Sequence, residues 1–191
     1  MNTDPFVFLI DTVFTIYIFL VLLRFLMQWL GADFFNPVAQ FIVKVTKPLL
    51  NPLRKILPAG GHFDYASLIA LFVLQALFGY LMALLQGGQV SFGPLAIWTT
   101  GQLVELVLKT FIVLIIVRAI LSWINPGPHN AAVALMYDLT DPLLNFGRRM
   151  IPPISGIDLS PMIIIIGLEF LRRLLIPLFQ QMLVSTQSIA F

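Results

Sequence analysis

The sequence contains no cysteine and only two histidines. The absence of cysteine excludes disulfides, thiol chemistry, iron–sulfur clusters and cysteine-ligated zinc. His62 and His129 lie in predicted loops, and neither has the spacing of a metal-binding motif or a membrane position suited to a haem ligand. Glycine-rich phosphate loops and nucleophile–base sets are also missing from the sequence. We therefore predict that the protein is not an enzyme and binds no metal and no cofactor.

Charge is scarce as well. Charged residues make up 10% of the chain, against about 25% in an average globular protein. The net charge of +2 is too small to predict nucleic-acid binding. Hydrophobic residues reach 59%, and a membrane-spanning helix needs about 20 mainly apolar residues. Four segments meet that requirement, near 6–30, 65–86, 98–124 and 162–184, so we predict an all-α membrane protein with four transmembrane helices.

The Lys and Arg residues of the connections predict the orientation of these helices. They are concentrated in the two long connections, 31–64 and 125–160, and basic connections remain in the cytoplasm. Both termini are then expected outside the cytoplasm. No basic residue precedes the first apolar segment and no small-residue cleavage site follows it, so we interpret it as a retained helix and not a signal peptide.

Each long connection has apolar residues at spacings of three and four, with cations on the opposite face. This pattern is typical of a helix that lies in the membrane interface. Proline lacks an N–H group and is tolerated best in the first turn of a helix. We therefore expect Pro48 and Pro142 to divide each connection into a bent pair of interfacial helices, at 37–46 and 48–57, and at 131–140 and 142–151.

The chain also contains itself twice, at an offset of 94 residues. The alignment has no gap and preserves prolines, charges and a tryptophan, so it predicts a tandem repeat with halves 1–93 and 94–191. Both halves should have the same orientation, related by a pseudo-twofold axis along the membrane normal. The matched positions include Arg24 and Arg118, Trp29 and Trp123, Asn36 and Asn130, Thr46 and Thr140, Arg54 and Arg148, Pro58 and Pro152, and Asp64 and Asp158.

Asp64 and Asp158 each stand just before a predicted membrane helix. We expect both carboxylates to cap the helices that follow, because the first turn of a helix leaves its N–H groups unsatisfied.

Two positions of the repeat have opposite charge in the two halves. Lys44 aligns with Asp138, and Lys47 aligns with Asp141. One hypothesis is that segments 37–46 and 131–140 face each other and pair Lys with Asp. The alternative is that the two aspartates cap helices.

The charged residues form two groups of candidate functional residues. The first group is the basic face of the connections, which we expect either to bind partner proteins and anionic lipid or to anchor the helices at the membrane. It comprises Lys44, Lys47, Arg54, Lys55, Arg148 and Arg149.

The second group lies within the apolar segments, where ionisable residues mark function by default. Arg24 and Arg118 are expected to extend toward the interface, with contacts to the other half of the chain or to a lipid phosphate as the alternative. The pairs Glu105–Lys109 and Glu169 with Arg172 or Arg173 are expected to neutralise each other within their helices, with a polar path for ions as the alternative. The group comprises Asp11, Arg24, Glu105, Lys109, Arg118, Glu169, Arg172 and Arg173.

The repeated motif R-x4-W…N-x9-T-x-P-L-L-N-x2-R-[KR]-x2-P…D, at Arg24–Asp64 and Arg118–Asp158, resembles the YggT (YlmG-like) family. The segments Phe41–Pro48 and Gly156–Met162 are similar to its two-copy bacterial members. The resemblance implies an inner-membrane protein with roles in osmotic stress or ion homeostasis, division and the assembly of membrane complexes. It supplies no catalytic residue. In this chain Lys47 replaces the aspartate of the motif in the first copy.

Two functions follow as expectations. The preferred one is a non-enzymatic scaffold or assembly factor that organises membrane proteins or anionic lipid through the basic face. The alternative is an ion channel, transporter or channel modulator that uses the charged residues within the apolar segments. Self-association into a homo-oligomer is compatible with both functions.

Overall fold

A computed structural model describes residues 4–57, 63–124, 130–151 and 158–188, and these residues are almost entirely helical. The helices are α1 (Pro5–Leu30), α2 (Pro37–Ile56), α3 (Tyr65–Leu85), α4 (Phe92–Ile124), α5 (Ala131–Met150) and α6 (Ser160–Ser188). The predicted all-α class is therefore confirmed. His62, His129, Pro58, Pro152 and the side chain of Trp123 lie outside the described part of the chain.

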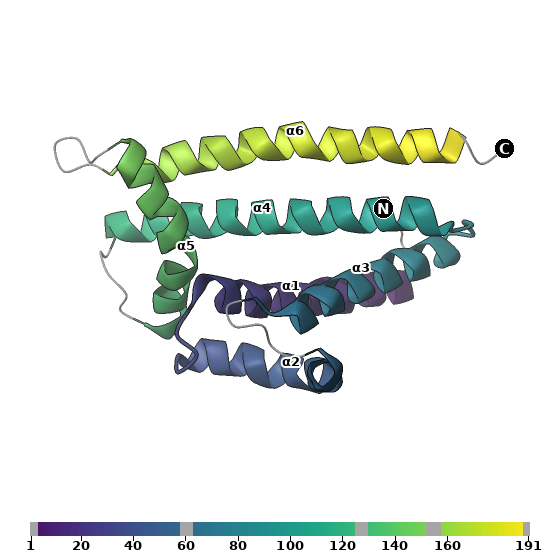
Figure 1. Cartoon of the computed structure of the whole chain (residues 1–191), viewed down its shortest axis with the longest axis horizontal. Helices are drawn as coiled ribbons and strands as arrows, with labels where there is room; N and C mark the ends of the chain where they lie inside the picture. Colours follow the sequence, from purple (N-terminus) through teal and green to yellow (C-terminus); the bar gives the residue numbers. More distant parts are fainter. Residues whose placement is uncertain (1–3, 58–62, 125–129, 152–157, 189–191) are drawn as a thin grey trace.

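The four long helices run side by side (Figure 1). Helices α1 and α4 run in one direction, and α3 and α6 return in the other. Helix α2 lies beside α1, and α5 crosses near the ends of α4 and α6 (Figure 1). The start of α1 and the end of α6 lie at the end of the molecule opposite α5. The two halves therefore have the same order of elements and the same direction.

The packing between the halves does not follow the predicted pseudo-twofold axis. Helix α3 packs against α4, where a Cβ atom on Gly79 would lie only 2.3 Å from the Trp98 ring. The equivalent pair, α6 with α1, is not among the principal helix contacts of the described residues. The positions that match Gly79 and Trp98 are Arg173 and Asp4. A glycine and an indole can pack closely, whereas two charged side chains do not form an apolar contact of this kind.

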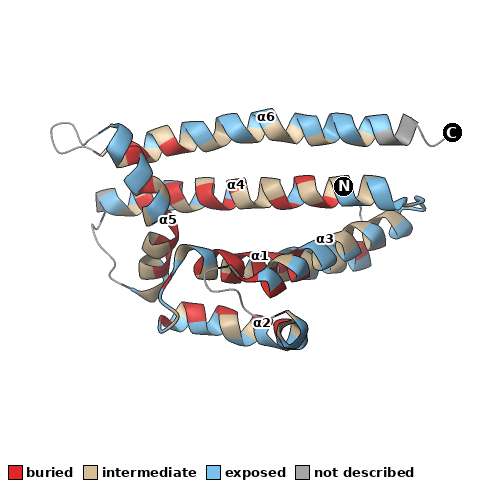
Figure 2. Ribbon diagram, viewed as in Figure 1, coloured by how far each residue is buried: buried red, intermediate tan, exposed pale blue. Residues whose placement is uncertain are grey.

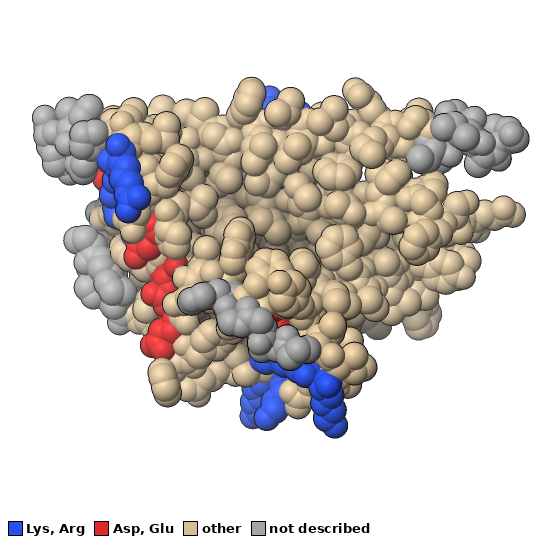
Figure 3. Space-filling model, viewed as in Figure 1, with Lys and Arg blue, Asp and Glu red and all other residues tan. Residues whose placement is uncertain are grey.

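Helices α1 and α3 are long and apolar enough to cross a membrane, with mean hydropathies of 2.6 and 2.4. Large apolar side chains are exposed on the long helices, including Phe19, Val73, Ile116 and Phe170. Figure 2 shows exposed residues along much of α6, while buried residues gather where α1, α2 and α5 meet. On the face shown in Figure 3, charged residues follow the left and lower edges and the rest is largely uncharged. Apolar surface of this extent indicates contact with a membrane or a partner.

Helices α2 and α5 correct the predicted interfacial pairs. Each is one continuous helix, with Pro48 and Pro52 inside α2 and Pro142 inside α5. Residues before and after the proline are buried in the same core, as Ile42 and Leu50 are in α2. Packing on both sides therefore holds the helix together despite the missing backbone hydrogen bond. The expected bend is present, since Figure 1 shows the first turns of α2 from the side and its last turns end-on.

Candidate functional site

Arg24 lies in the second half of α1 and is 5% exposed. Its Nη1 atom donates to the Val43 carbonyl oxygen and to Thr46 Oγ1, each at 2.9 Å. Thr46 Oγ1 donates in turn to the Ile42 carbonyl oxygen at 2.7 Å. Because a buried guanidinium is costly without hydrogen-bond partners, this contact fixes α2 to α1. We call it the first arginine clamp.

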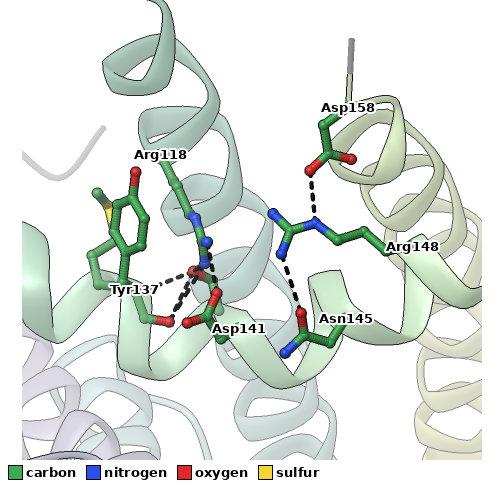
Figure 4. Close-up of polar contacts among 8 residues, drawn as sticks. Arg118, Tyr137, Asp141, Asn145, Arg148 and Asp158 are labelled. Carbon is green, nitrogen blue, oxygen red and sulfur yellow. Dashed lines mark hydrogen bonds and ion pairs between the residues drawn. The ribbon is translucent and has the colours of Figure 1, made fainter. Parts of the chain in front are cut away.

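Arg118 on α4 forms the second arginine clamp, which holds α5 (Figure 4). Its Nη1 atom donates to Thr140 Oγ1 at 2.7 Å, matching the contact of Arg24 with Thr46. Two further contacts have no counterpart in the first clamp: Nη2 donates to Asp141 Oδ1 at 2.6 Å, and the guanidinium carbon lies 3.9 Å from the centre of the Tyr137 ring. The second clamp therefore contains its own carboxylate and an aromatic face for the cation.

Asp64 joins α2 to the start of α3. Its carboxylate caps α3, accepting from the Ser67 amide at 3.2 Å and from Ser67 Oγ at 2.7 Å, and it also forms an ion pair with Arg54 of α2. Burial raises the pKa of the Asp64 carboxyl, but the hydrogen bonds from Ser67 and Arg54 together outweigh burial and hold that pKa below its usual value. The predicted capping role of Asp64 is confirmed.

Asp158 makes the equivalent connection in the second half (Figure 4). Its Oδ2 atom accepts from Arg148 Nε at 2.8 Å, and its Oδ1 atom accepts from the Ser160 amide at 2.9 Å at the start of α6. Arg148 also donates to Asn145 Oδ1 at 3.1 Å. Burial raises the pKa of the Asp158 carboxyl, and hydrogen bonds from Ser160 and Arg148 reverse that effect and lower it overall.

These contacts change the interpretation of four arginines. Arg24 and Arg118 were expected to extend toward the interface, but both are buried and bind α2 and α5. Because burial removes water from both guanidinium groups, they must donate their hydrogen bonds to acceptor atoms of the protein. Arg54 and Arg148 were placed on the open basic face, but both are paired with the aspartates that cap the next helix.

The rest of the basic face has no such partners. Its residues are exposed and form no ion pair with any described residue. They are Lys44, Lys47, Lys55 and Arg149.

The hypothesis that Lys44 and Lys47 pair with Asp138 and Asp141 is wrong. Asp138 Oδ2 accepts instead from the Asp33 amide at 3.1 Å, and Asp141 pairs with Arg118. The two connections do meet, because the Asn36 side chain donates to the Ala131 carbonyl oxygen at 2.7 Å. Neither aspartate caps a helix, since both lie inside α5.

The charged residues of α4 and α6 form one connected group. The predicted pairs within each helix are present: Lys109 Nζ lies 2.8 Å from Glu105 Oε1, and Glu169 binds both Arg172 and Arg173. Arg172 Nη1 also lies 3.4 Å from Glu105 Oε1 and so connects the two helices, a contact that spacing along one helix could not reveal. Asp11 is exposed on α1 and pairs with no described residue.

Chemically, this arrangement is suited to holding helices in place and presenting cations. Among the described residues, no three His, Asp or Glu side chains are grouped so that they could hold a metal ion. The repeated motif residues Arg24, Thr46, Arg54 and Asp64 all form contacts inside the protein. The exposed cations of α2 and α5 (Lys44, Lys47, Lys55 and Arg149) are the part of the basic face that is available to bind another molecule.

Comparison with known proteins identifies relatives of this chain. The sequence model of the CCB3/YggT family matches residues 3–85 and again residues 97–179. The two matches start at residues 3 and 97, which are 94 residues apart, the same offset as that of the internal repeat. The "Uncharacterized protein YggT" of Escherichia coli strain K12 is 42% identical over 170 residues, covering 87% of this chain and 85% of that protein.

Two other relatives extend the comparison. An uncharacterized protein of Pseudomonas aeruginosa is 39% identical over 178 residues, covering 92% of this chain and 90% of its own length. The "YlmG homolog protein 2, chloroplastic" of Arabidopsis thaliana is 39% identical over 56 residues, which are 29% of this chain and 22% of that protein. No solved structure matches the chain.

Proposed function

Because this chain belongs to the CCB3/YggT family, we propose that it is a non-enzymatic scaffold of the bacterial inner membrane. In this proposal α1, α3, α4 and α6 span the membrane, and both termini are periplasmic. Helices α2 and α5 form a cytoplasmic platform that organises membrane proteins and anionic lipid. The resemblance to the family connects this role with osmotic stress, division and the assembly of membrane complexes.

The observation that carries the proposal is the different use of the basic residues on α2 and α5. Four arginines form contacts inside the protein, and these contacts hold α2 and α5 in place. They are Arg24, Arg54, Arg118 and Arg148. The exposed cations Lys44, Lys47, Lys55 and Arg149 form no ion pair with any described residue. A rigid helix that presents unpaired cations is suited to binding an acidic surface.

Exposed apolar residues on the same helices support a position at the membrane surface. Phe41 of α2 is 59% exposed, and Phe146 of α5 is 62% exposed. Aromatic side chains beside cations are characteristic of helices that insert partly into the headgroup region. The proposal therefore combines anchoring with binding, because one group of side chains can do both.

Affinity purification in mild detergent from native membranes tests the scaffold function. We expect a stoichiometric partner that is lost when Lys44, Lys47, Lys55 and Arg149 are all changed to Gln. The control changes to Ala four exposed polar residues outside α2 and α5, namely Gln86, Gln89, Gln102 and Gln180. If no partner is recovered from either membranes or cross-linked cells, or if the control loses the partner equally, the scaffold function is refuted.

The second candidate function is ion conduction or modulation of a channel. It is favoured by the five charged side chains shared between α4 and α6, centred on the contact of Arg172 with Glu105. The same ion pairs can have a purely structural role, because these charges neutralise one another and connect α4 to α6. Ion flux in liposomes distinguishes the two: conduction requires flux that falls when Glu105 and Glu169 become Gln, whereas a brace predicts no flux in either protein.

A further inference from the structure

A cavity of about 270 Å³ opens beside α2 in the first half of the chain. It is lined by Phe34, Gln40, Val43, Lys44 and Lys47. Two of these side chains are exposed cations without an ion-pair partner among the described residues. The third polar side chain is Gln40, whose Nε2 atom donates one hydrogen bond to the Phe35 carbonyl oxygen at 3.1 Å and has a second N–H group to donate. The cavity thus combines a concave shape with positive charge.

The second half of the chain supplies a comparison in which the same positions are acidic. Lys44 and Lys47 correspond to Asp138 and Asp141, and Asp141 neutralises Arg118. Between Arg24 and Asp64 there are five cations and two carboxylates, whereas between Arg118 and Asp158 there are three of each. The segment from Arg118 to Asp158 is therefore balanced by its own residues, whereas the segment from Arg24 to Asp64 has three more cations than carboxylates.

The first arginine clamp has no carboxylate partner of its own. Arg24 is buried, yet no carboxylate of the described chain lies within ion-pair distance of it. Its Nε atom is buried without a hydrogen-bond partner. Its Nη1 atom binds the carbonyl of Val43, a residue that also lines the cavity. A polyanion in the cavity would supply the counter-charge that Asp141 provides in the other half.

We infer that this cavity binds the phosphate headgroup of an anionic phospholipid, with Lys44 and Lys47 as the direct ligands. A phosphate carries several acceptor oxygens and suits two ammonium groups and an amide donor. A lipid is favoured over a soluble phosphate because Phe35 and Phe41, close by in the chain, are 87% and 59% exposed and can contact acyl chains. This inference rests on the proposed position of α2 at the membrane surface.

The test uses the full chain in nanodiscs or detergent, with native mass spectrometry to count bound phosphatidylglycerol and phosphatidylcholine. The site variant is Lys44→Asp with Lys47→Asp, which installs the residues of the second half. A second site variant, Lys44→Gln with Lys47→Gln, removes both positive charges without adding negative ones. Its matched control is Gln86→Glu with Gln89→Glu, which lowers the net charge by the same amount at exposed positions outside α2 and α5.

We expect the wild-type protein to retain phosphatidylglycerol in preference to phosphatidylcholine, at one molecule per chain. Both site variants should bind phosphatidylglycerol more weakly, by about thirty-fold for the Gln pair, and the control should stay within about three-fold of wild type. Equal losses in the site variants and the control would overturn the site, as would a wild-type protein without lipid preference. Full competition by soluble glycerol phosphate would overturn the choice of a lipid.

Membrane fractionation of the same proteins separates this inference from the proposed function. A protein that remains membrane-inserted and captures its partner but shows no lipid preference refutes the lipid site alone. A protein that does not insert refutes both.

Discussion

Replacing Asp64 should destabilise the protein more than replacing Asp158, although the two residues occupy the same position in the repeat. Asp64 is 2% exposed and accepts two hydrogen bonds from Ser67 as well as the ion pair with Arg54. Loss of a helix cap costs about 1 kcal/mol, and loss of a hydrogen bond to a buried charge costs about 2 kcal/mol more. We therefore expect Asp64→Ala to lower the free energy of unfolding by about 3 kcal/mol.

Asp158 is less buried, with side-chain exposures of 38% for Arg148 and 31% for Asp158 in that ion pair. Water screens such a pair, so Asp158→Ala should cost about 1 kcal/mol, mainly from the lost contact with the Ser160 amide. Asp64→Asn retains a capping oxygen but loses the charge, and should lie between the two. Reversible unfolding in mixed micelles measures all three variants. Equal losses for Asp64→Ala and Asp158→Ala would refute the assignment of the difference to burial.

Three further predictions address pH, close packing and the arginine clamps. Folding lowers the pKa of Asp64 and of Asp158, so the two carboxylates stabilise the protein above the unfolded carboxyl pKa of about 4, and this stabilisation is lost as pH falls through their folded pKa values. Between pH 6 and pH 3 the unfolding midpoint should therefore fall less in the Asp64→Asn, Asp158→Asn double variant than in the wild-type protein. Parallel curves for the two proteins would contradict this. Gly79→Ala should cost about 1–3 kcal/mol because its Cβ would lie 2.3 Å from the Trp98 ring, whereas Gly167→Ala meets nothing within 4 Å and should be neutral or stabilising in the same unfolding assay. Arg24→Met should increase hydrogen exchange in α2 alone and Arg118→Met in α5 alone; unchanged exchange in both helices would show that the clamps do not hold them.

The sequence predicted the repeat and the capping aspartate Asp64, because both depend on patterns along the chain. It also predicted the pairs Glu105–Lys109 and Glu169–Arg173, because residues four apart on a helix are neighbours. The contacts of Arg24 and Arg118 were missed, since each reaches a threonine 22 residues away on another helix. The constant spacing of Arg and Thr in both copies was the signal that could have found them.

Pro48 shows a different limit of sequence reasoning. Local preference places proline at the start of a helix, yet packing of Ile42 and Leu50 against one core holds a continuous helix through it. The packing of the two halves against each other could not be predicted from the repeat either. It depends on contacts such as that of Gly79 with Trp98, and the residues at the matching positions of the repeat have different chemistry. Patterns within one helix were therefore more informative than patterns between helices.

The unequal charge of the two connections, 31–64 and 125–160, has an evolutionary consequence. A dimer of two identical half-length chains must repeat every residue, so an excess of cations on one subunit appears on the other as well. Joining both copies in a single chain removes this constraint, and each can then diverge. The result here is a molecule with one balanced side, around Asp138 and Asp141, and one side with surplus lysines, around Lys44 and Lys47. The two sides of such a protein can therefore bind different partners, which the two sides of a symmetric dimer cannot do.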